Sequence, residues 1–333
     1  MNRIAIIGAG SWGTALGIMA ARAGHEVRLW SRNAEIVESI NNKRLNPTYL
    51  TTARIPAGVW ATGEIVAALE QSSLVVLAAP SHALRDLLTK MSPALNEEVI
   101  IVSAAKGIEA ESGQRISQIV DEVAGRGRAA RFVCLSGPSF AKEVVEKNPT
   151  AIVAASNDAE AARIVQAAFS FENLRIYTND DIVGTELGGS VKNVMAIAAG
   201  MVDGLGFGSN SVAALITRGL AEISRLALCE GAKLETLMGL AGLGDLVLTC
   251  TGNLSRNRFV GQELGKGRSL EEITAGMTEI AEGVKTTRAV KRLADRLNIE
   301  MPITNAVSEV LYNQKPPDDA VTELMTRRLR EEV

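Results

Sequence analysis

Within its first thirty residues the chain has the order of a strand, a glycine turn and a helix, which few folds accommodate. An apolar run, Arg3 to Ile7, leads directly into Gly8-Ala9-Gly10-Ser11-Trp12-Gly13 and a helix-forming segment, and a second run, Glu26–Trp30, follows. The first glycine permits a tight turn, the second lets the backbone approach a pyrophosphate, and the third lets the helix pack on the sheet. The helix N-terminus then offers N–H groups to the anion. The sequence therefore predicts a βαβ unit that binds a dinucleotide.

Length and charge limit the number of domains and the kinds of partner that the protein can have. A chain of 333 residues favours two domains, and a net charge of −3 argues against a nucleic-acid or membrane partner. Cys134, Cys229 and Cys250 are widely spaced, which fits a reducing cytoplasm and predicts neither a zinc site nor a disulfide framework. The first strand leaves no room for a signal peptide, and the apolar stretch Val194–Val202 is too short to span a bilayer. We expect a soluble cytoplasmic protein without a metal.

The first half of the sequence alternates apolar strand-like runs with helical ones, as in a doubly wound α/β sheet covered by helices on both faces. The predicted strands are Arg3–Ile7, Glu26–Trp30, Val59–Ala61, Leu74–Ala78, Val99–Val102, Phe132–Leu135, Ala151–Ala154 and Leu174–Tyr177. Helical segments such as Ser81–Met91 and Asp158–Phe169 lie between them. We therefore predict a Rossmann-type, dinucleotide-binding domain over residues 1–180.

Beyond residue 180 the strand signals stop and helices joined by glycine-rich turns are expected. Ser211–Glu230 has apolar residues at helical spacing, with Gly231 as a stop. Ser269 to Glu272 is a capping box that opens another helix, and Pro302 suits the first turn of the last substantial helix. Residues 181–333 are thus predicted to form an all-helical substrate and catalytic domain.

A buried lysine is the strongest candidate for chemistry. Glu186 to Gly200 is helical in length and rich in small residues, which suits a helix packed closely against its neighbours, and Lys192 and Asn193 interrupt it. Desolvation or a nearby cation lowers the pKa of such a lysine. It could donate a proton to a carbonyl oxygen as a hydride arrives, and take it back in reverse. The pattern fits equally well a lysine whose ammonium group reaches the helix surface.

Other segments offer groups suited to a small anion. Lys106 follows one predicted strand, and Ser136–Phe140 follows the next, at the edge where ligands collect in open α/β sheets. The cluster Ser255–Arg258 offers charge-assisted donors suited to phosphate. The plain alternatives are a solvated lysine, a turn into a helix and a solvated basic turn.

The end of the second predicted strand bears on the choice of cofactor. An acidic residue there would bind the ribose 2′-hydroxyl of NAD, but the chain has Ser31-Arg32-Asn33. Arg32 with Ser31 favours the 2′-phosphate of NADP(H), and NAD(H) remains possible. His25 is interpreted as structural and His82 as a surface residue at a helix start, so a lysine is the better proton donor.

Taken together, these motifs resemble the NAD(P)-dependent glycerol-3-phosphate dehydrogenases of the bacterial cytoplasmic type. The resemblance runs through nearly the whole chain and rests on Gly8–Gly13, Ala104–Gly107, Leu135–Ala141, Lys192-Asn193, Gly242–Leu246 and Ser255–Asn257. It implies reversible reduction of dihydroxyacetone phosphate to sn-glycerol 3-phosphate, which feeds glycerophospholipid synthesis. Family members are often dimers, so a homodimer is possible.

The resemblance also implies roles for individual residues. Lys192 would be the catalytic proton donor and acceptor. The implied substrate site consists of Lys106, Gly137, Ser139, Lys192, Asp245, Ser255, Arg256 and Asn257. With the glycine turn, the cofactor site consists of Gly8, Gly10, Ser11, Trp12, Gly13, Arg32, Lys106, Ala141, Arg256 and Glu282. The chain has Asn33 where the family pattern has a second basic residue.

Two alternatives remain at this point. A related Rossmann dehydrogenase acting on a 3-hydroxyacid or a ketopantoate-like compound would also use a lysine from a helical domain. The Lys106 motif and the Ser255–Asn257 cluster argue against it. A non-enzymatic NAD(P)-sensing protein would have no need for Lys192 in a buried helix.

Overall fold

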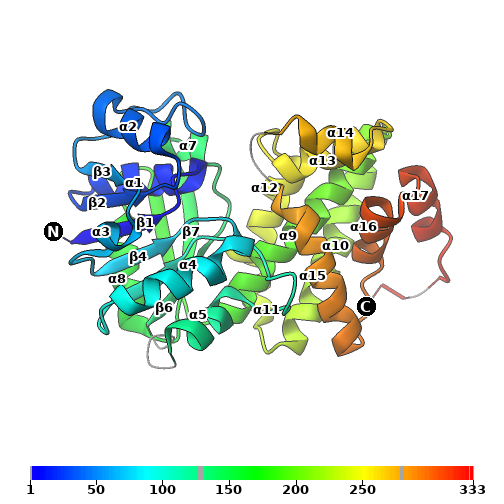
Figure 1. Ribbon diagram of the computed structural model, residues 1–333. Helices are drawn as coiled ribbons and strands as arrows, with labels where there is room; N and C mark the ends of the chain where they lie inside the picture. Colours follow the sequence, from blue (N-terminus) through cyan, green and yellow to red (C-terminus); the bar gives the residue numbers. More distant parts are fainter. Residues whose placement is uncertain (1, 126–130, 278–280, 330, 333) are drawn as a thin grey trace.

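The computed structural model describes residues 2–125, 131–277, 281–329 and 331–332, and Figure 1 shows a half built around a sheet beside a half built of helices. Within the described residues, one eight-stranded sheet has the order β3-β2-β1-β4-β5-β6-β7-β8. Its strands are β1 (Arg3–Ile7), β2 (Glu26–Trp30), β3 (Val59–Thr62), β4 (Leu74–Leu77), β5 (Ile100–Ser103), β6 (Phe132–Ser136), β7 (Thr150–Ala155) and β8 (Leu174–Asn179). Each predicted strand is confirmed, with ends that differ by at most two residues.

Strand β1 lies between β2 and β4, and the carboxyl ends of these three strands form the edge of the sheet where the glycine turn lies. Its last residue, Ile7, pairs in parallel with Trp30 of β2 on one side and with Leu77 of β4 on the other. The three strands therefore end at the same level, and the loops that follow them lie side by side. One junction departs from the parallel pattern, because β7 runs antiparallel to β6 and parallel to β8.

Helices cover both faces of the sheet, so most strand residues are apolar and buried. Leu16 and Met19 of α1 share one core with Val165 of α8, and Leu88 of α4 shares the opposite core with Ile119 of α5. The helical elements of this half are α1 (Ser11–Arg22), α2 (Ala34–Lys43), α3 (Ile65–Leu69), η1 (Ser81–Ala83), α4 (Leu84–Met91), η2 (Ser92–Ala94), α5 (Ile116–Ala124), α7 (Ala141–Val145) and α8 (Ala159–Phe169). The predicted doubly wound, Rossmann-type sheet is confirmed.

The second half is organised around α9, which is surrounded by α10, α12, α13 and α15 (Figure 1). Its helical elements are α9 (Ile182–Gly204), α10 (Ser209–Cys229), α11 (Leu234–Leu237), the π-helical η3 (Leu240–Gly244), α12 (Asp245–Thr251), α13 (Arg256–Gly265), α14 (Leu270–Ala275), α15 (Glu282–Leu297), α16 (Pro302–Asn313) and α17 (Pro317–Met325). The Ser269 capping box and Pro302 in the first turn of a helix are both confirmed. The helix predicted to be the last substantial one, α16, is followed by the nine-residue α17.

Each half of the chain contributes apolar residues to the hydrophobic core of the other half. Ile182 and Ala241 enter the core on one face of the sheet, while Ile108 of the first half enters the core around α9. Strand β8 ends at Asn179 and α9 begins at Ile182. The division of the chain into residues 1–180 and 181–333 stays a prediction.

One stretch among the described residues, Leu234–Thr251, is long and apolar enough to cross a membrane by composition. It is not a continuous α-helix, because it contains α11, the π-helical η3 and α12. It carries Asp245, which is almost completely buried against the lysines described below. Core segments of water-soluble proteins pass the same test of composition.

Glycines allow the backbones of α9 and α13 to cross at short range. A Cβ atom on Gly261 would lie 1.9 Å from the carbonyl oxygen of Ile197, and one on Gly200 would lie 2.0 Å from that of Arg258. Backbone atoms cannot yield as a flexible side chain can, so α9 holds its position only with these small residues.

We expect Gly261→Ala to lower the free energy of unfolding by at least about 1–3 kcal/mol, because the added methyl group forces the two helices apart. Urea unfolding followed by circular dichroism measures the change. Gly208→Ala is the matched control, since no heavy atom lies within 4 Å of a Cβ there. Equal stability of the two variants would contradict the close crossing.

Candidate active site

The glycine turn after β1 has the geometry that a dinucleotide needs. Gly8 has φ +122°, and a Cβ there would lie 2.7 Å from the backbone nitrogen of Ala79. A Cβ on Gly13 would lie 2.0 Å from the carbonyl oxygen of Gly8. By contrast, nothing lies within 4 Å of a Cβ on Gly10. Two glycines are thus required by packing, and the third leaves open space.

That open space lies at the N-terminus of α1. Gly10 is the N-cap residue, no side chain caps this helix end, and its first turn contains no acidic residue. The first-turn N–H groups and the helix dipole therefore favour an anion in this position. Trp12 adds a buried indole N–H that has no partner among the described residues. The turn fits the pyrophosphate of a dinucleotide.

The residues after β2 divide into structural and exposed groups. Ser31 is buried and its hydroxyl accepts a hydrogen bond from the N–H of Asn33. The Asn33 side chain in turn caps α2 by accepting from Glu35 and Ile36. Arg32 between them is exposed. Asn33 therefore serves the helix end, and Arg32 alone offers a positive charge.

A buried carboxylate joins the two candidate lysines. Lys106 Nζ lies 2.7 Å from Asp245 Oδ2 and 2.8 Å from the carbonyl oxygen of Gly137. Lys192 Nζ bonds to Asp245 Oδ1 and lies 2.8 Å from Thr249 Oγ1. Asp245 is 1% exposed and Lys192 is 5% exposed. The alternative in which Lys192 reaches the helix surface is therefore wrong.

The environment of Lys192 suits proton transfer. The pKa of Lys192 is lowered to about 7, mainly by burial and also by the charge of Lys106, whereas Asp245 acts in the opposite direction. A group whose pKa lies near the working pH can both give and take a proton. Two ammonium groups share one carboxylate here, so the centre keeps a net positive charge when both are protonated.

The structure also places the remaining predicted residues. Asn193 on α9 donates to the carbonyl oxygen of Lys106 at 3.1 Å, and the Ser139 hydroxyl donates to that of Gly137 at 3.0 Å. Trp12 and Ala141 pack against the same core of the sheet half. These contacts gather Lys106, Gly137, Ser139, Lys192 and Asp245 at the junction of the two halves.

Two side chains of the Ser255–Asn257 cluster are used in hydrogen bonds to the backbone. The Ser255 hydroxyl caps α13 by accepting from the N–H of Arg258, and Asn257 Oδ1 accepts from the N–H of Gly283. Arg256 is exposed at the start of α13. Burial raises the pKa of Glu282, and the N–H of Ser81 and the charge of Arg256 oppose that effect. Arg256 and Glu282 therefore lie near one another.

Sequence reasoning did not assign a role to Thr249. Its hydroxyl accepts from Lys192 Nζ and donates to the carbonyl oxygen of Asp245 at 2.6 Å. Asp245 and Thr249 are four residues apart, so they lie on one face of α12. The spacing of four residues from Asp245 was the one sequence signal that could have pointed to Thr249.

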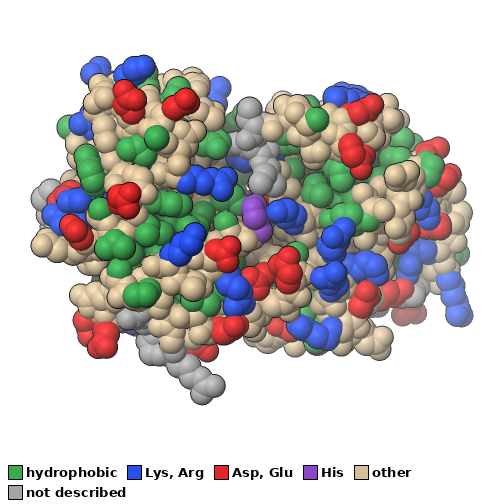
Figure 2. Space-filling model, in the orientation of Figure 1, with side chains coloured by type: hydrophobic (Ala, Val, Ile, Leu, Met, Phe, Trp, Pro, Cys, Tyr) green, Lys and Arg blue, Asp and Glu red, His purple; other side chains and the backbone are tan. Residues whose placement is uncertain are grey.

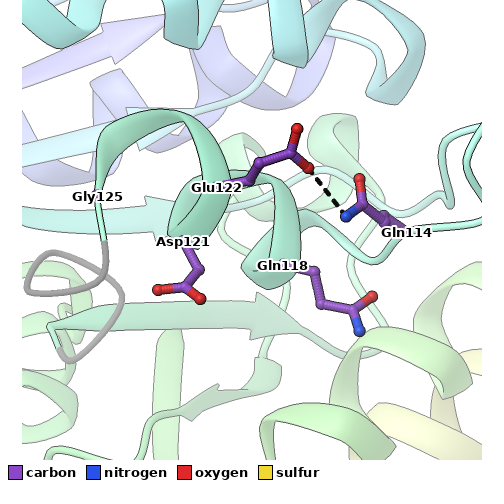
Figure 3. A pocket seen from close by; sticks show the side chains of 5 residues that line it. All are labelled: Gln114, Gln118, Asp121, Glu122 and Gly125. Carbon is purple, nitrogen blue, oxygen red and sulfur yellow. Dashed lines mark hydrogen bonds between the residues drawn. The ribbon is translucent and has the colours of Figure 1, made fainter.

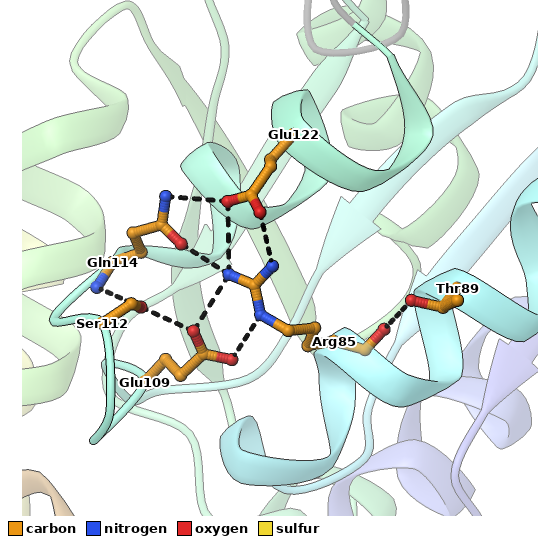
Figure 4. Close-up of polar contacts among 6 residues, drawn as sticks. All are labelled: Arg85, Thr89, Glu109, Ser112, Gln114 and Glu122. Carbon is orange, nitrogen blue, oxygen red and sulfur yellow. Dashed lines mark hydrogen bonds and ion pairs between the residues drawn. The ribbon is translucent and has the colours of Figure 1, made fainter.

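A charged network fixes the segment that follows Lys106 (Figure 4). Arg85 on α4 holds Glu109 through two hydrogen bonds of 2.8 and 3.0 Å and also bonds to Glu122 of α5. These bonds raise the pKa of Arg85, and the bonds from Arg85 lower that of the Glu109 carboxyl. The loop that presents Lys106 is thereby tied to two helices.

A surface hollow beside this network is not the active site. It is lined by Gln114, Gln118, Asp121, Glu122 and Gly125 (Figure 3). Its side chains are polar or acidic, and it contains none of the predicted site residues. Among the described residues, no group of three or more histidine, cysteine, aspartate or glutamate side chains could hold a metal ion.

We expect Asp245→Ala to lower the free energy of unfolding at pH 7 by about 3 kcal/mol. Stability falls because two lysines lose their buried counter-charge. Lys192 can release its proton and become neutral, so the loss should lie near the lower end of the range for broken buried ion pairs. Denaturant unfolding measures it. Asp180→Ala, which breaks an exposed pair with Lys233, should have little effect. A small cost for both variants would contradict the buried centre.

Comparisons with known proteins agree over both halves of the chain. Two family models match, the NAD-dependent glycerol-3-phosphate dehydrogenase N-terminus at residues 3–162 and the C-terminus at residues 181–322. An NAD(P)+-dependent glycerol-3-phosphate dehydrogenase of Koribacter versatilis is 53% identical over 335 aligned positions, covering 100% of this chain and 99% of the relative. One of Geobacter sp. strain M21 is 49% identical, covering 99% of each chain.

Solved structures show the same relationship. A glycerol-3-phosphate dehydrogenase from Coxiella burnetii is 41% identical with a TM-score of 0.94, covering 98% of this chain and 99% of that one. A ketopantoate reductase from Ralstonia eutropha is 18% identical with a TM-score of 0.60, which shows a common fold alone. The chain belongs to the family of NAD(P)-dependent glycerol-3-phosphate dehydrogenases.

Proposed function

We propose that this chain catalyses the reversible reduction of dihydroxyacetone phosphate to sn-glycerol 3-phosphate with NAD(P)H, and so supplies glycerophospholipid synthesis. The observation that carries the proposal is the buried centre of Lys106, Asp245 and Lys192 at the junction between a dinucleotide-binding turn and a helical half. Relatives named for this activity match the whole chain. The ketopantoate-like alternative has only the common fold in its favour.

Reduction of a ketone needs a hydride at carbon and a proton at oxygen, and NAD(P)H supplies the hydride when bound. Lys192 holds the proton at Nζ and gives it to the carbonyl oxygen, becoming neutral. Asp245 and Thr249 orient that ammonium group through their oxygens. Lys106 adds positive charge where negative charge develops on the oxygen. In the reverse direction, neutral Lys192 takes the hydroxyl proton.

Arg256 is proposed to bind the substrate phosphate, because its guanidinium is exposed at the start of α13 and suits a bidentate contact with phosphate oxygens. Ser255 and Asn257 would place it, since both are tied to neighbouring backbone. Gly137 and Ser139 would line the substrate site from the loop after β6. A phosphate held away from the reacting carbon orients the carbonyl group.

The cofactor site is proposed to contain Gly8, Gly10, Ser11, Trp12, Gly13, Arg32, Lys106, Ala141, Arg256 and Glu282. Arg32 supports a preference for NADP(H) over NAD(H). Residues 1–180 would form the cofactor domain and residues 181–333 the substrate domain. We further propose a cytoplasmic location, without insertion into a membrane and without a nucleic-acid partner, with a homodimer as the possible assembly. Three cysteines that form no disulfide support the reducing compartment.

The direct test mixes the purified protein with dihydroxyacetone phosphate and either NADPH or NADH and follows loss of reduced-nicotinamide absorbance. Because reduction needs protonated Lys192, kcat/KM should fall as pH rises through about 7, the pKa of Lys192. Oxidation of glycerol 3-phosphate needs the neutral amine, so its rate should rise over the same range. Failure to oxidise either donor, in protein that binds it, would refute the activity.

Lys192→Ala should remove most of the turnover, because the substrate oxygen loses its proton donor, while leaving NADPH binding nearly unchanged. A loss of about 10²–10⁴-fold in kcat is the usual size of such a contribution. Steady-state kinetics and isothermal titration with NADPH separate the two effects. Loss of cofactor affinity without loss of turnover would contradict the role of Lys192.

Arg256→Ala should raise KM for dihydroxyacetone phosphate by about 10–100-fold, since a hydrogen bond to a charged group is lost. Arg258→Ala is the matched control, because Arg258 bonds to Asp203 and Asn253 and is assigned no contact with substrate. Initial rates over a range of substrate concentrations measure both. An unchanged KM for Arg256→Ala would overturn its assignment to the phosphate.

A further inference from the structure

Arg32, His82 and Lys285 are exposed side chains from three separate segments of the chain. Figure 2 shows basic side chains and a histidine around the hollow where the two halves face each other. Arg32 belongs to the proposed cofactor site, whereas no role has been assigned to His82 or Lys285. Their arrangement follows from the sheet and from the position of α15.

The sheet brings Arg32 and His82 to the same edge. Trp30 at the end of β2 and Leu77 at the end of β4 both pair with Ile7, one on each side. Neighbouring strands lie about 4.8 Å apart, so these two strand ends are separated by only about 10 Å. Arg32 lies two residues beyond one end, and His82 lies in η1, shortly after the other.

Helix α15 brings Lys285 to η1 from the helical half. The N–H of Ser81 donates to Glu282 Oε1 at 2.8 Å. A Cβ on Gly107 would lie 2.3 Å from Ser81 Oγ and 3.7 Å from Thr286 Oγ1, so η1 and the first turns of α15 pack around this glycine. Lys285 is three residues after Glu282 and therefore lies on the adjoining helix surface.

The electrostatics of His82 agree with this placement. Burial lowers the pKa of His82, the charges of Lys285 and Arg32 lower it further, and the carboxylate of Glu111 acts in the opposite direction. Coulomb interactions weaken with distance, so these are the charged groups near the imidazole. A neutral imidazole still offers one N–H donor.

These side chains are available for a ligand. Arg32, His82 and Lys285 make no hydrogen bond or ion pair with any residue in the described ranges. Lys291, further along the same helix, is instead paired with Asp295 at 3.2 Å. Exposed cations from two halves of a chain, left unpaired around one position, favour an anion between them.

We propose that Lys285 and His82 complete, with Arg32, the site for the 2′-phosphate of NADPH. The inference rests on the proposed function, because it names what selects the cofactor of that reaction. The pyrophosphate belongs at Gly10 and the N-terminus of α1, whereas the ribose 2′ position lies at the end of β2, beside Arg32. Lys285 reaches that position from the helical half, so both halves set the preference for NADPH.

The test is isothermal titration of NADPH and of NADH, at low salt, into the full-length wild type, Lys285→Gln and Lys291→Gln. Lys285→Gln should lower the affinity for NADPH about three- to fivefold, the size expected of one partly exposed charge pair, and leave the affinity for NADH unchanged. Lys291→Gln removes the same charge from the same helix and should change neither affinity. Glu111→Gln removes an opposing charge and should raise the affinity for NADPH.

Two results would overturn the inference. One is an unchanged ratio of NADPH to NADH affinity in Lys285→Gln, and the other is an equal loss for both nucleotides, which would place Lys285 at a group that they share. Lys285→Arg keeps the charge and should keep the NADPH affinity, which separates charge from folding. Failure of the wild type to bind either nucleotide would instead refute the proposed function, so the two failures are distinguishable.

Discussion

The interaction on which the site depends is the sharing of one buried carboxylate by two lysines. Asp245 holds Lys106 from the sheet half and Lys192 from the helical half, and it is almost inaccessible to solvent. Without it, two ammonium groups would repel each other in a poorly solvated position. The same contact joins the halves, positions the proton donor and leaves that donor with a pKa near the working pH.

Helix α9 can present Lys192 there because glycines let neighbouring segments approach it. Gly188 lies against the backbone of Ala241 and Gly200 against that of Arg258, while Gly189 lies against the Ser136 hydroxyl, each too close for a Cβ. The Lys192 side chain is almost completely buried, so its ammonium group needs partners within the protein. Close packing thus creates the chemical property that the proposed reaction needs.

Local pattern predicted the fold well because its signals are local. Most strands of the sheet are buried apolar runs, and burial on both faces is visible in the residues themselves. The antiparallel β7 and the helix α17 were not predicted. Strand direction depends on where the chain re-enters the sheet, and α17 is a short helix that begins at a proline pair. Neither leaves a clear periodic signal.

Spacing along the chain was enough to predict the dinucleotide turn, the sheet, the helical second half and a short set of candidate polar residues. It left open whether Lys192 was buried or solvated and gave no role to Thr249. Those two points depend on contacts between distant segments of the folded chain. Lys106 and Asp245 are 139 residues apart and Lys192 and Thr249 are 57 apart, so their contacts follow from how α9 and α12 pack at the sheet edge.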